Sequence, residues 1–414
     1  MSGLNVELYG TLLGTLSQSG SGLDFLVDEK VFDRYPLSST VMSLSTPLNP
    51  RFTNPQKKRC RNFFAGLLPE GRNLSWLAQT LPVRERDTYG ILRKYGKDIA
   101  GALLIYDPGD EAAARAAKAE KVGPKEIRYL FEHMPQEPLA NSPVSGKTSL
   151  GGMQRKIVLA KKGASWYRTH YGYPSTHILK PAPPEYPTMI YDEAFCMQLA
   201  YGIGLTGHAV WIENFDGADG LVIERYDRDG KAPTGRIHQE DFNQALGAHG
   251  NEKYQEYGGK VSAKRIAETL DRFCGADDVR RFAEQLIFSI AIGNLDMHAK
   301  NVSVLHYPDE AVRLAPVYDQ VPLRHQGTDG RMALAIGGEY VHANLTAQKI
   351  REELLSWKTG AFRNDRETDR FINNFLEICA GALEKTAVHE NVYPRLKTDI
   401  AAFVSNLLSG KCVG

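Results

Sequence analysis

The chain has 414 residues, of which 42% are hydrophobic and 24% are charged, and its formal net charge is +1. That length exceeds a typical single core, so we expect two or three subdomains. The balanced charge gives no reason to expect direct binding to nucleic acid, a membrane surface or an acidic partner. The five cysteines are scattered without a CxxC motif, which argues against disulfides and zinc and favours a reducing, cytoplasmic setting. There is no signal-peptide pattern and no apolar run long enough to cross a bilayer, so we expect no membrane insertion.

The pattern of apolar residues changes along the chain. Residues 1–107 mix short alternating runs, broken by glycine, with the helical stretch NLSWLAQTL, and predict a small α+β unit. Residues 108–125 are rich in alanine and charged residues, which indicates a linker or an exposed helix. Residues 126–230 carry β-branched and aromatic runs around the helical segment YDEAFCMQLAYGIGL, whereas residues 231–414 mostly follow the helical period. A sheet-containing lobe followed by a helical lobe favours a cleft enzyme that uses a nucleotide.

The stretch GNLDMHAKNVSV, residues 293–304, gathers polar side chains directly after an apolar run. The run Phe282–Ile292 predicts a buried helix, which Gly293 can end in the left-handed conformation. A strand, a turn and a returning strand are expected after Asn301, with Asp319 at the far end. Such a hairpin would bring Asp319 back beside Asn301.

Phosphoryl transfer to a hydroxyl needs side chains of this kind. Asp296 would orient the nucleophile and accept its proton, while Asn301 and Asp319 would hold Mg²⁺ on the phosphates. The spacing D-x-x-x-x-N followed by a hairpin and an aspartate is the kinase arrangement, although the H-R-D triplet and the Phe-Gly after the last aspartate are missing. An aspartate and an asparagine that only satisfy turn backbone at a helix end are the alternative.

A kinase also needs groups that position ATP, and candidates occur upstream. Gly151 and Gly152, preceded by the hydroxyls of Thr148 and Ser149, lie just before a strand, where backbone N–H groups can approach phosphate oxygens. An ordinary glycine turn is the alternative. The nearby SGKT lacks the first glycine and the preceding strand of a Walker A loop, so we reject a P-loop.

Two further groups fit a nucleotide site. Lys180 ends the apolar strand of THILKP, and Glu193 shares a helical stripe with Met197 and Ala200 that should face the packed side. A buried glutamate needs a partner, and Lys180 can form this structural ion pair; a lysine on the protein surface is the alternative. Residues 224–226 in GLVIERYDRDG could bond an adenine through their backbone or simply connect the lobes.

Over nearly its whole length the chain resembles the HipA-type serine/threonine kinases, bacterial toxins of two-gene toxin–antitoxin systems. The resemblance is carried by FFAGLLPEG, LRKYGKDIAGAL, SLGGMQRK, THILKP, DEAFCMQLA, LVIERYDR, RIHQEDFNQALG, KYQEYGG, NLDMHAKNVSV and LAPVYD. It implies an α+β, kinase-like two-lobe fold. The implied parts are a family-specific N-terminal subdomain at 1–107, a linker or exposed helix at 108–125, a nucleotide-binding N-lobe at 126–230 and a helical catalytic C-lobe at 231–414.

The resemblance also implies ATP and Mg²⁺ as cofactors and a role for each site residue. Asp296 would be the catalytic base, and Asn301 with Asp319 would bind Mg²⁺. Ser149 would be autophosphorylated, and its phosphate would repel ATP and switch the enzyme off. The residues implied to contact the nucleotide are Gly151, Gly152, Met153, Gln154, Arg155, Lys156, Lys180, Glu224, Arg225, Tyr226, His298, Ala299, Lys300, Asn301, Tyr318 and Asp319.

Known substrates in the family are translation components such as aminoacyl-tRNA synthetases, and the implied partner is a helix-turn-helix antitoxin of the HipB type. The charge balance and the lack of a helix-turn-helix signature argue that this chain contacts DNA only indirectly, through the antitoxin. We therefore expect a protein kinase. Two alternatives stay open: a small-molecule or lipid kinase, because LDMHAKN also resembles the D-x-H-x-x-N loop of phosphoinositide kinases, and a non-catalytic nucleotide-binding co-repressor.

Overall fold

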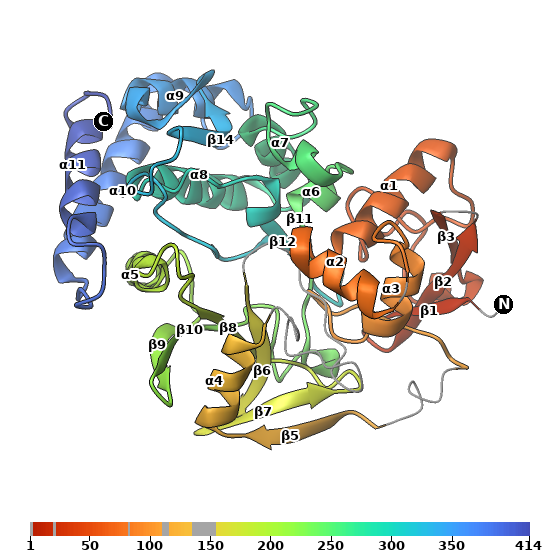
Figure 1. The fold of residues 1–414 in the computed structure, drawn as a ribbon. Coiled ribbons are helices and arrows are strands. Elements are labelled where there is room, and N and C mark those ends of the chain that lie inside the picture. Colours follow the sequence, from red (N-terminus) through yellow and green to blue (C-terminus); the bar gives the residue numbers. More distant parts are fainter. Residues whose placement is uncertain (1–2, 20–21, 82, 110–115, 135–154) are drawn as a thin grey trace.

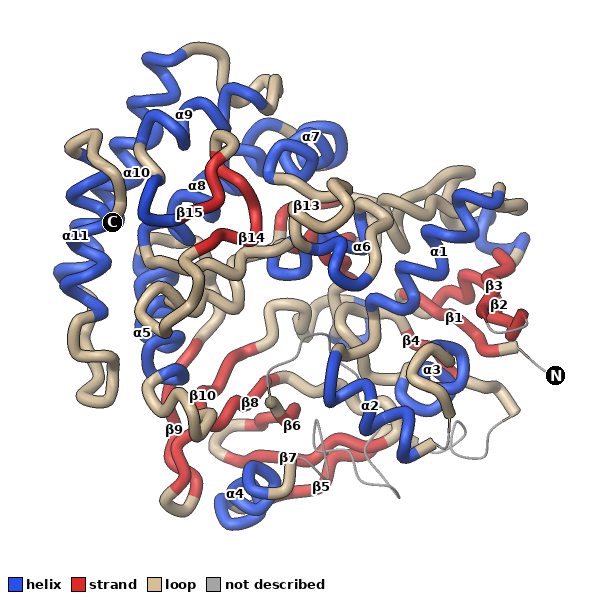
Figure 2. The backbone as a smooth tube through the Cα atoms, turned by 45° about the horizontal axis from the view of Figure 1, so that its top comes forward, coloured by secondary structure: helices blue, strands red, loops and turns tan. Residues whose placement is uncertain are grey.

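The computed structural model describes residues 3–19, 22–81, 83–109, 116–134 and 155–414, and these form a mixed α+β protein, as expected (Figure 1). The strands fall into four sheets within the described ranges, and the two larger sheets precede the helical lobe in the chain. Figure 2 shows the N-terminal strands and helices on one side of the molecule, beside both the second sheet and the later helices. Nowhere in the described ranges does a helix combine the length and the hydropathy needed to cross a membrane.

The N-terminal subdomain is an antiparallel sheet of order β3-β2-β1-β4 packed against helices. Its elements are β1 (Leu4–Leu8), β2 (Thr11–Ser19), β3 (Gly22–Val27), α1 (Asn54–Gly66), α2 (Gly71–Thr80), α3 (Thr88–Tyr95) and β4 (Leu104–Tyr106). Alternate residues of β1, such as Val6, are buried against α1 residues such as Phe63 and Phe64. The expected helix falls on α2. The sequence pattern did not predict α1 and α3; α1 begins with a capping box of Thr53 and Gln56, which satisfies backbone donors in its first turn.

The second sheet is six-stranded and antiparallel, of order β5-β7-β6-β8-β10-β9. Its elements are β5 (Lys118–Val122), α4 (Pro124–Glu132), β6 (Ile157–Lys162), β7 (Ser165–His170), β8 (His177–Pro181), α5 (Met189–Gly202), β9 (Val210–Phe215) and β10 (Ala218–Glu224). Apolar side chains of α4, including Ile127 and Phe131, cover one part of the sheet. The helix α5 instead shares its core with the helical lobe and lies between that lobe and the sheet (Figure 1).

Residues 108–125 differ from the expected linker or exposed helix. Residues 118–122 form β5, which pairs with β7 at the edge of the second sheet, and α4 begins at Pro124. The sequence of β5, KAEKV, is dominated by charged and exposed residues, as is common for an edge strand. Composition therefore could not separate it from a linker, because only pairing with β7 makes it a strand. Residues 110–115 lie outside the described residues.

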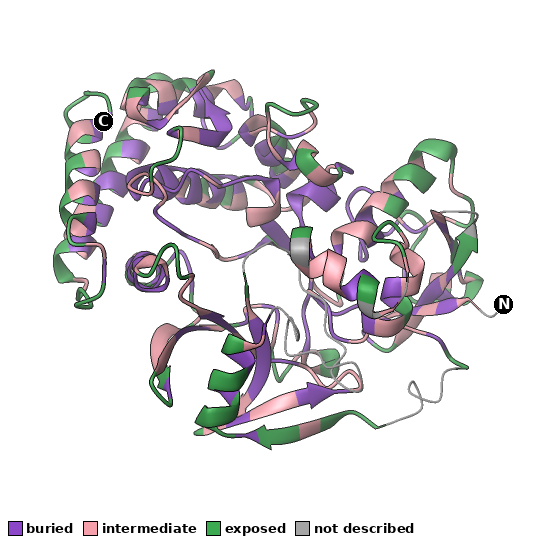
Figure 3. Ribbon diagram, in the orientation of Figure 1, coloured by how far each residue is buried: buried purple, intermediate pink, exposed green. Residues whose placement is uncertain are grey.

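The C-terminal lobe is mostly helical, with two small sheets. Its elements are β11 (His238–Asp241), α6 (Phe242–Ala245), α7 (Ala263–Phe273), α8 (Ala276–Ala291), β12 (Ser303–His306), β13 (Val312–Leu314), β14 (Arg331–Ile336), β15 (Glu339–Val341), α9 (Ala347–Ser356), α10 (Asp365–Lys385) and α11 (Leu396–Leu408). The predicted buried helix is confirmed as α8, which is buried along most of its second half (Figure 3). Gly293 has φ +71°, and the N–H of Asn294 bonds Ser289 O at 2.9 Å, so the helix ends in the predicted left-handed turn.

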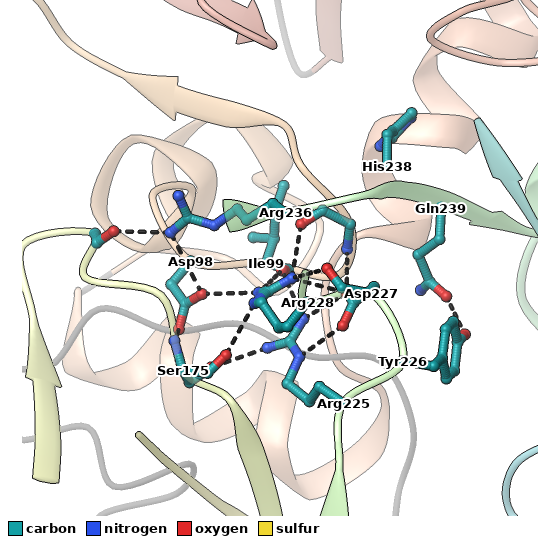
Figure 4. A network of polar contacts seen from close by, with 12 residues as sticks. Asp98, Ile99, Ser175, Arg225, Tyr226, Asp227, Arg228, Arg236, His238 and Gln239 are labelled. Atoms are coloured by element: carbon teal, nitrogen blue, oxygen red, sulfur yellow. Dashed lines mark hydrogen bonds and ion pairs between the residues drawn. The ribbon is translucent and has the colours of Figure 1, made fainter. Parts of the chain in front are cut away.

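A buried network of charges joins the three parts of the molecule just after β10 (Figure 4). Arg225 Nη2 lies 2.7 Å from Asp227 Oδ2 and Arg225 Nη1 donates to Ser175 Oγ at 2.9 Å. Arg228 Nη2 lies 3.1 Å from Asp98 Oδ1, which belongs to the N-terminal subdomain. Removing one partner of a buried ion pair leaves the other charge uncompensated, so this junction is sensitive to single changes.

We expect Asp227→Ala to lower the free energy of unfolding by ~3–5 kcal/mol, because it leaves the buried Arg225 guanidinium without its carboxylate. Urea denaturation followed by fluorescence measures the change. Glu185→Ala, which removes an exposed carboxylate, is the control and should stay within about 0.5 kcal/mol of wild type. Equal losses in the two variants would contradict the structural role of the network.

Candidate active site

The ammonium of Lys180, on β8, is the centre of the candidate site. Its Nζ lies 2.7 Å from Glu193 Oε1 on α5 and 2.7 Å from Asp319 Oδ1 in the helical lobe. Lys180 and Glu193 are buried, whereas the Asp319 side chain is 38% exposed. Burial alone would lower the pKa of Lys180, but the carboxylates of Asp319 and Glu193 outweigh it and raise the pKa. The lysine therefore stays charged and links the second sheet to the helical lobe.

Asp319 lies in a strained turn after β13. Its φ of +55° is in the left-handed region that a residue with a side chain rarely adopts. The carbonyl of Asp319 accepts hydrogen bonds from Val321 N–H at 3.1 Å and from Asn294 Nδ2 at 3.5 Å, which hold the turn. Burial would raise the pKa of Asp319, but the ammonium of Lys180 lowers it to about 2. The carboxylate is therefore ionised at neutral pH, which suits it to bind a cation.

Hydrogen bonds within the loop after α8 fix Asp296 and Asn301 relative to each other. Asn301 Nδ2 donates to Asp296 O at 2.8 Å, and Asp296 N–H donates to Asn294 Oδ1 at 3.0 Å. Because the amide nitrogen of Asn301 is engaged, its oxygen is the atom suited to bind a cation. The Asp296 side chain is 45% exposed, and the hydroxyl of Tyr254 is near enough to lower its pKa.

The environment of Asp296 suits a proton acceptor. Burial, and then the negative charge of Asp319, raise the pKa of Asp296 to about 6. His298 Nε2 lies 3.9 Å from Asp296 Oδ2, but burial, and then the charge of Lys253, lower the pKa of His298 to about 3. The imidazole is neutral at physiological pH, so this contact is not an ion pair. A carboxylate with a pKa near 6 is ionised at neutral pH and still basic enough to take a proton.

Lys300 was expected to line the nucleotide site. Its ammonium instead contacts a residue of the N-terminal subdomain. Its Nζ lies 3.1 Å from Glu70 Oε1, and the other oxygen of Glu70 lies 2.7 Å from Lys253 Nζ. Burial would raise the pKa of Glu70, but the two lysines lower it to about 2. Sequence reasoning did not single out Glu70 or Lys253, because nothing in the sequence indicates that Glu70 contacts Lys253, 183 positions away, and Lys300, 230 positions away.

The predicted adenine-binding segment, residues 224–226, begins at the last residue of β10. The N–H of Glu224 donates to Ala209 O at 3.0 Å and the N–H of Arg225 donates to Thr176 O at 2.9 Å. These two N–H groups therefore already have backbone partners. The side chain of Arg225 is also occupied, since it belongs to the buried network of Figure 4.

Two tyrosines connect this segment to the loop of Asn301. The rings of Tyr226 and Tyr318 lie 5.4 Å apart, centre to centre. Tyr318 Oη donates to Lys300 O at 2.8 Å and lies 2.6 Å from Ser303 Oγ. Ala299 is fully buried, so it packs the loop against the core.

The remaining predicted nucleotide contacts lie before β6. Gly151, Gly152, Met153 and Gln154 lie outside the described residues, as does Ser149. Arg155 is exposed. Burial, and then the positive charge of Lys180, lower the pKa of Lys156 to about 8, which indicates that the two ammonium groups lie near each other.

Asn301 and Asp319 suit Mg²⁺ in the presence of phosphates. Mg²⁺ commonly takes one or two protein oxygens and completes its octahedron with phosphate and water. An ionised Asp319 and the amide oxygen of Asn301 would supply two such ligands. The described parts of the chain contain no group of three or more His, Cys, Asp or Glu side chains that could hold a metal ion. Phosphate and water would therefore have to supply the remaining ligands.

Comparison with known proteins places this geometry in a family. Residues 4–106 match the family described as the HipA N-terminal domain, and residues 148–387 match the HipA-like C-terminal domain. The putative kinase Y4mE of Sinorhizobium fredii is 32% identical over 395 residues, which cover 93% of this chain and 92% of the relative. The serine/threonine-protein kinase toxin HipA of Shewanella oneidensis is 27% identical and covers 97% of this chain and 93% of its own.

A solved structure agrees with the fold. The complex of HipA, HipB and operator DNA from Shewanella oneidensis contains a chain that aligns with a TM-score of 0.80 at 22% identity and covers 98% of this chain and 96% of that one. The family match at residues 148–387 alone spans more than half of the sequence. The resemblance seen in the sequence is thus confirmed, and the chain belongs to the HipA family.

Proposed function

We propose that this chain is an ATP- and Mg²⁺-dependent protein serine/threonine kinase of the HipA toxin type. The observation that carries the proposal is the triad of Lys180, Glu193 and Asp319 beside Asp296, a carboxylate of near-neutral pKa. An ammonium, an ionised carboxylate and a proton acceptor are what phosphoryl transfer from a metal-bound nucleotide requires. The names of the relatives, kinase and serine/threonine-protein kinase, support the same reaction class.

The residues would divide the chemistry as follows. Lys180, positioned by Glu193, binds phosphate oxygens of ATP, and Asp319 with Asn301 holds Mg²⁺, which neutralises charge on the phosphates. Asp296 orients the acceptor hydroxyl and takes its proton as the new bond to the γ-phosphorus forms. Most of the rate enhancement then comes from position and charge, because the protein forms no covalent intermediate.

We assign further nucleotide contacts by the same proposal. The adenine is bound at residues 224–226, and Tyr226 supplies the backbone donor because the N–H groups of Glu224 and Arg225 already bond within the protein. The other contacts are assigned to Gly151, Gly152, Met153, Gln154, Arg155, Lys156, His298, Ala299, Lys300 and Tyr318.

The proposal extends to target and partner. The acceptor is a serine or threonine of a cellular protein, such as a translation component, and the kinase acts in the cytoplasm as a toxin. A helix-turn-helix antitoxin of the HipB type binds it and carries any contact with DNA. Similarity to the chain in the HipA, HipB and operator DNA complex supports this partner.

We expect Asp296→Ala to lose ~10²–10⁴-fold of the phosphotransfer rate, because the acceptor hydroxyl loses its base. Incubation of purified protein and a cell extract with ATP labelled on the γ-phosphate measures the transfer. The control Asp309→Ala removes an exposed aspartate of the β12–β13 turn and should leave the rate unchanged. Label in an extractable metabolite would favour a small-molecule or lipid kinase, and full toxicity of Asp296→Ala would favour a non-catalytic co-repressor.

The pH dependence tests the state of Asp296. Below a pKa of about 6 the carboxyl is protonated and cannot accept a proton, so kcat/KM should fall about tenfold per pH unit on the acid side and level off above pH 7. The hydroxyl of Tyr254 lowers this pKa, so Tyr254→Phe should move the acid limb to higher pH. Tyr257→Phe, at an exposed ring, should not move it. An acid limb that stays in place in Tyr254→Phe would show that Asp296 is not the titrating group.

Autophosphorylation at Ser149 is tested by intact mass. After incubation with ATP and Mg²⁺ the wild type should gain one phosphate, which Ser149→Ala prevents, and the gain should coincide with loss of activity because the doubly charged group repels ATP. Ser145→Ala is the matched control and should still gain the phosphate. Peptide mapping that places the label on another residue would disprove the assignment.

A further inference from the structure

A cavity of 680 Å³ lies between the N-terminal subdomain and the helical lobe. Its walls come from α1, from the start of α2 and the residues leading into α3, and from the segments around residues 249–254 and 300. In Figure 1 these elements face one another where α1 and α2 lie beside α6. The volume is within the ~300–1,000 Å³ range of ligand-binding clefts.

One wall of the cavity lies beside the proposed catalytic base. Tyr254 lines the cavity, its ring packs edge-on against His298 with the ring centres 5.3 Å apart, and its hydroxyl is near enough to Asp296 to lower the pKa of that carboxyl. Among the described residues that line the cavity, neither Lys180 nor Asp319 is found, and Lys300 is the one that we also assign to the nucleotide. The cavity therefore adjoins Asp296 through Tyr254, apart from the ammonium and carboxylate proposed to hold the phosphates and the metal.

Part of the cavity wall is apolar. Leu74 and Tyr89 are half-buried on the lining, and Ala65 contributes to it from α1. Side chains that are only half-buried on a cavity wall gain burial when an apolar group packs against them. This part of the wall suits an apolar side chain of a bound molecule.

The rest of the lining is polar and close to charge balance. Lys253 and Lys300 both contact the carboxylate of Glu70. The charged side chains among the described lining residues are four basic, Arg61, Arg86, Lys253 and Lys300, and three acidic, Glu70, Glu85 and Asp87. A nucleic acid would require a strong surplus of positive charge, which this lining lacks. An extended polypeptide, with a polar backbone and side chains pointing to alternate sides, fits a lining that is partly apolar and partly polar.

We propose that this cavity docks the segment of the protein substrate that carries the acceptor hydroxyl. The hydroxyl lies at Asp296, and an apolar side chain of the same segment packs against Ala65, Leu74 and Tyr89. Asp296 takes the proton of the hydroxyl, the hydroxyl oxygen bonds to the γ-phosphorus, and the bond from that phosphorus to the bridging oxygen breaks to leave ADP. The inference rests on the proposed kinase function and makes the N-terminal subdomain part of substrate selection.

The test fills the cavity without changing any residue assigned to the nucleotide. Ala65→Trp places an indole in the cavity from α1, and Ala401→Trp puts the same side chain on an exposed position of α11 as the control. The probe is a set of peptides with a central serine or threonine in which each flanking position is varied in turn. The wild type should favour an apolar residue at one flanking position, and Ala65→Trp should lower kcat/KM for the favoured peptide by at least about tenfold, with an unchanged KM for ATP.

A second variant guards against misfolding of the first. Leu74→Ala removes part of the apolar wall and should weaken the preference for the apolar flanking residue, while thermal unfolding reports whether each variant is folded. Wild-type kcat/KM for the peptide in folded Ala65→Trp would overturn the inference, as would a wild type that labels proteins but no peptide. Loss of ATP binding in Ala65→Trp would assign the cavity to the nucleotide site instead. Activity in Asp296→Ala would overturn the proposed function itself. Failure of the proposed function can therefore be distinguished from failure of the docking inference.

Discussion

The ammonium of Lys180 is the charge on which the arrangement of the site depends. It lies at 2.7 Å from carboxylates on two different lobes, and a buried charge without partners costs several kcal/mol. The strand β8, the helix α5 and the turn at Asp319 are therefore positioned together. A metal ion on Asp319 would bring positive charge to that carboxylate, so Lys180 could exchange Asp319 for phosphate oxygens while Glu193 still holds it. Under the proposed function, the site would receive a metal–nucleotide without leaving any of its three charges unpaired.

Ion pairs also connect the N-terminal subdomain to the segments around this site. Glu70 bonds Lys300, one residue before Asn301, and Asp98 bonds Arg228 just after the predicted adenine-binding segment. Buried ion pairs add little net stability, but they fix relative position, because any displacement separates charges in a medium of low dielectric. The subdomain therefore helps to hold both the loop of the proposed base and the segment between the lobes, and it forms one wall of the cavity beside that base.

Local pattern was enough to predict the parts of the site that obey local rules. The apolar run before Gly293 had to be a buried helix with a left-handed end, and Glu193 on the packed stripe of α5 needed a partner. The charged edge strand β5 could not be predicted from local pattern, because it is a strand only through its pairing with β7. The contact of Glu70 with Lys253 and Lys300 was also hidden, because it depends on how two subdomains pack and leaves no period or spacing in the sequence.

The most informative property of the site is the difference in pKa between two neighbouring carboxyl groups, those of Asp319 and Asp296. Lys180 lowers the pKa of Asp319 to about 2, and the negative charge that it thereby maintains on Asp319 adds to burial in raising the pKa of Asp296 to about 6. One ammonium thus fixes two roles, since the first group is a permanent anion that can hold a cation and the second can gain and lose a proton near neutral pH. The distinction does not come from the residue type, which is the same at both positions. It arises because Lys180 contacts the carboxylate of Asp319. The positions of β8 and of the strained turn after β13 determine this contact.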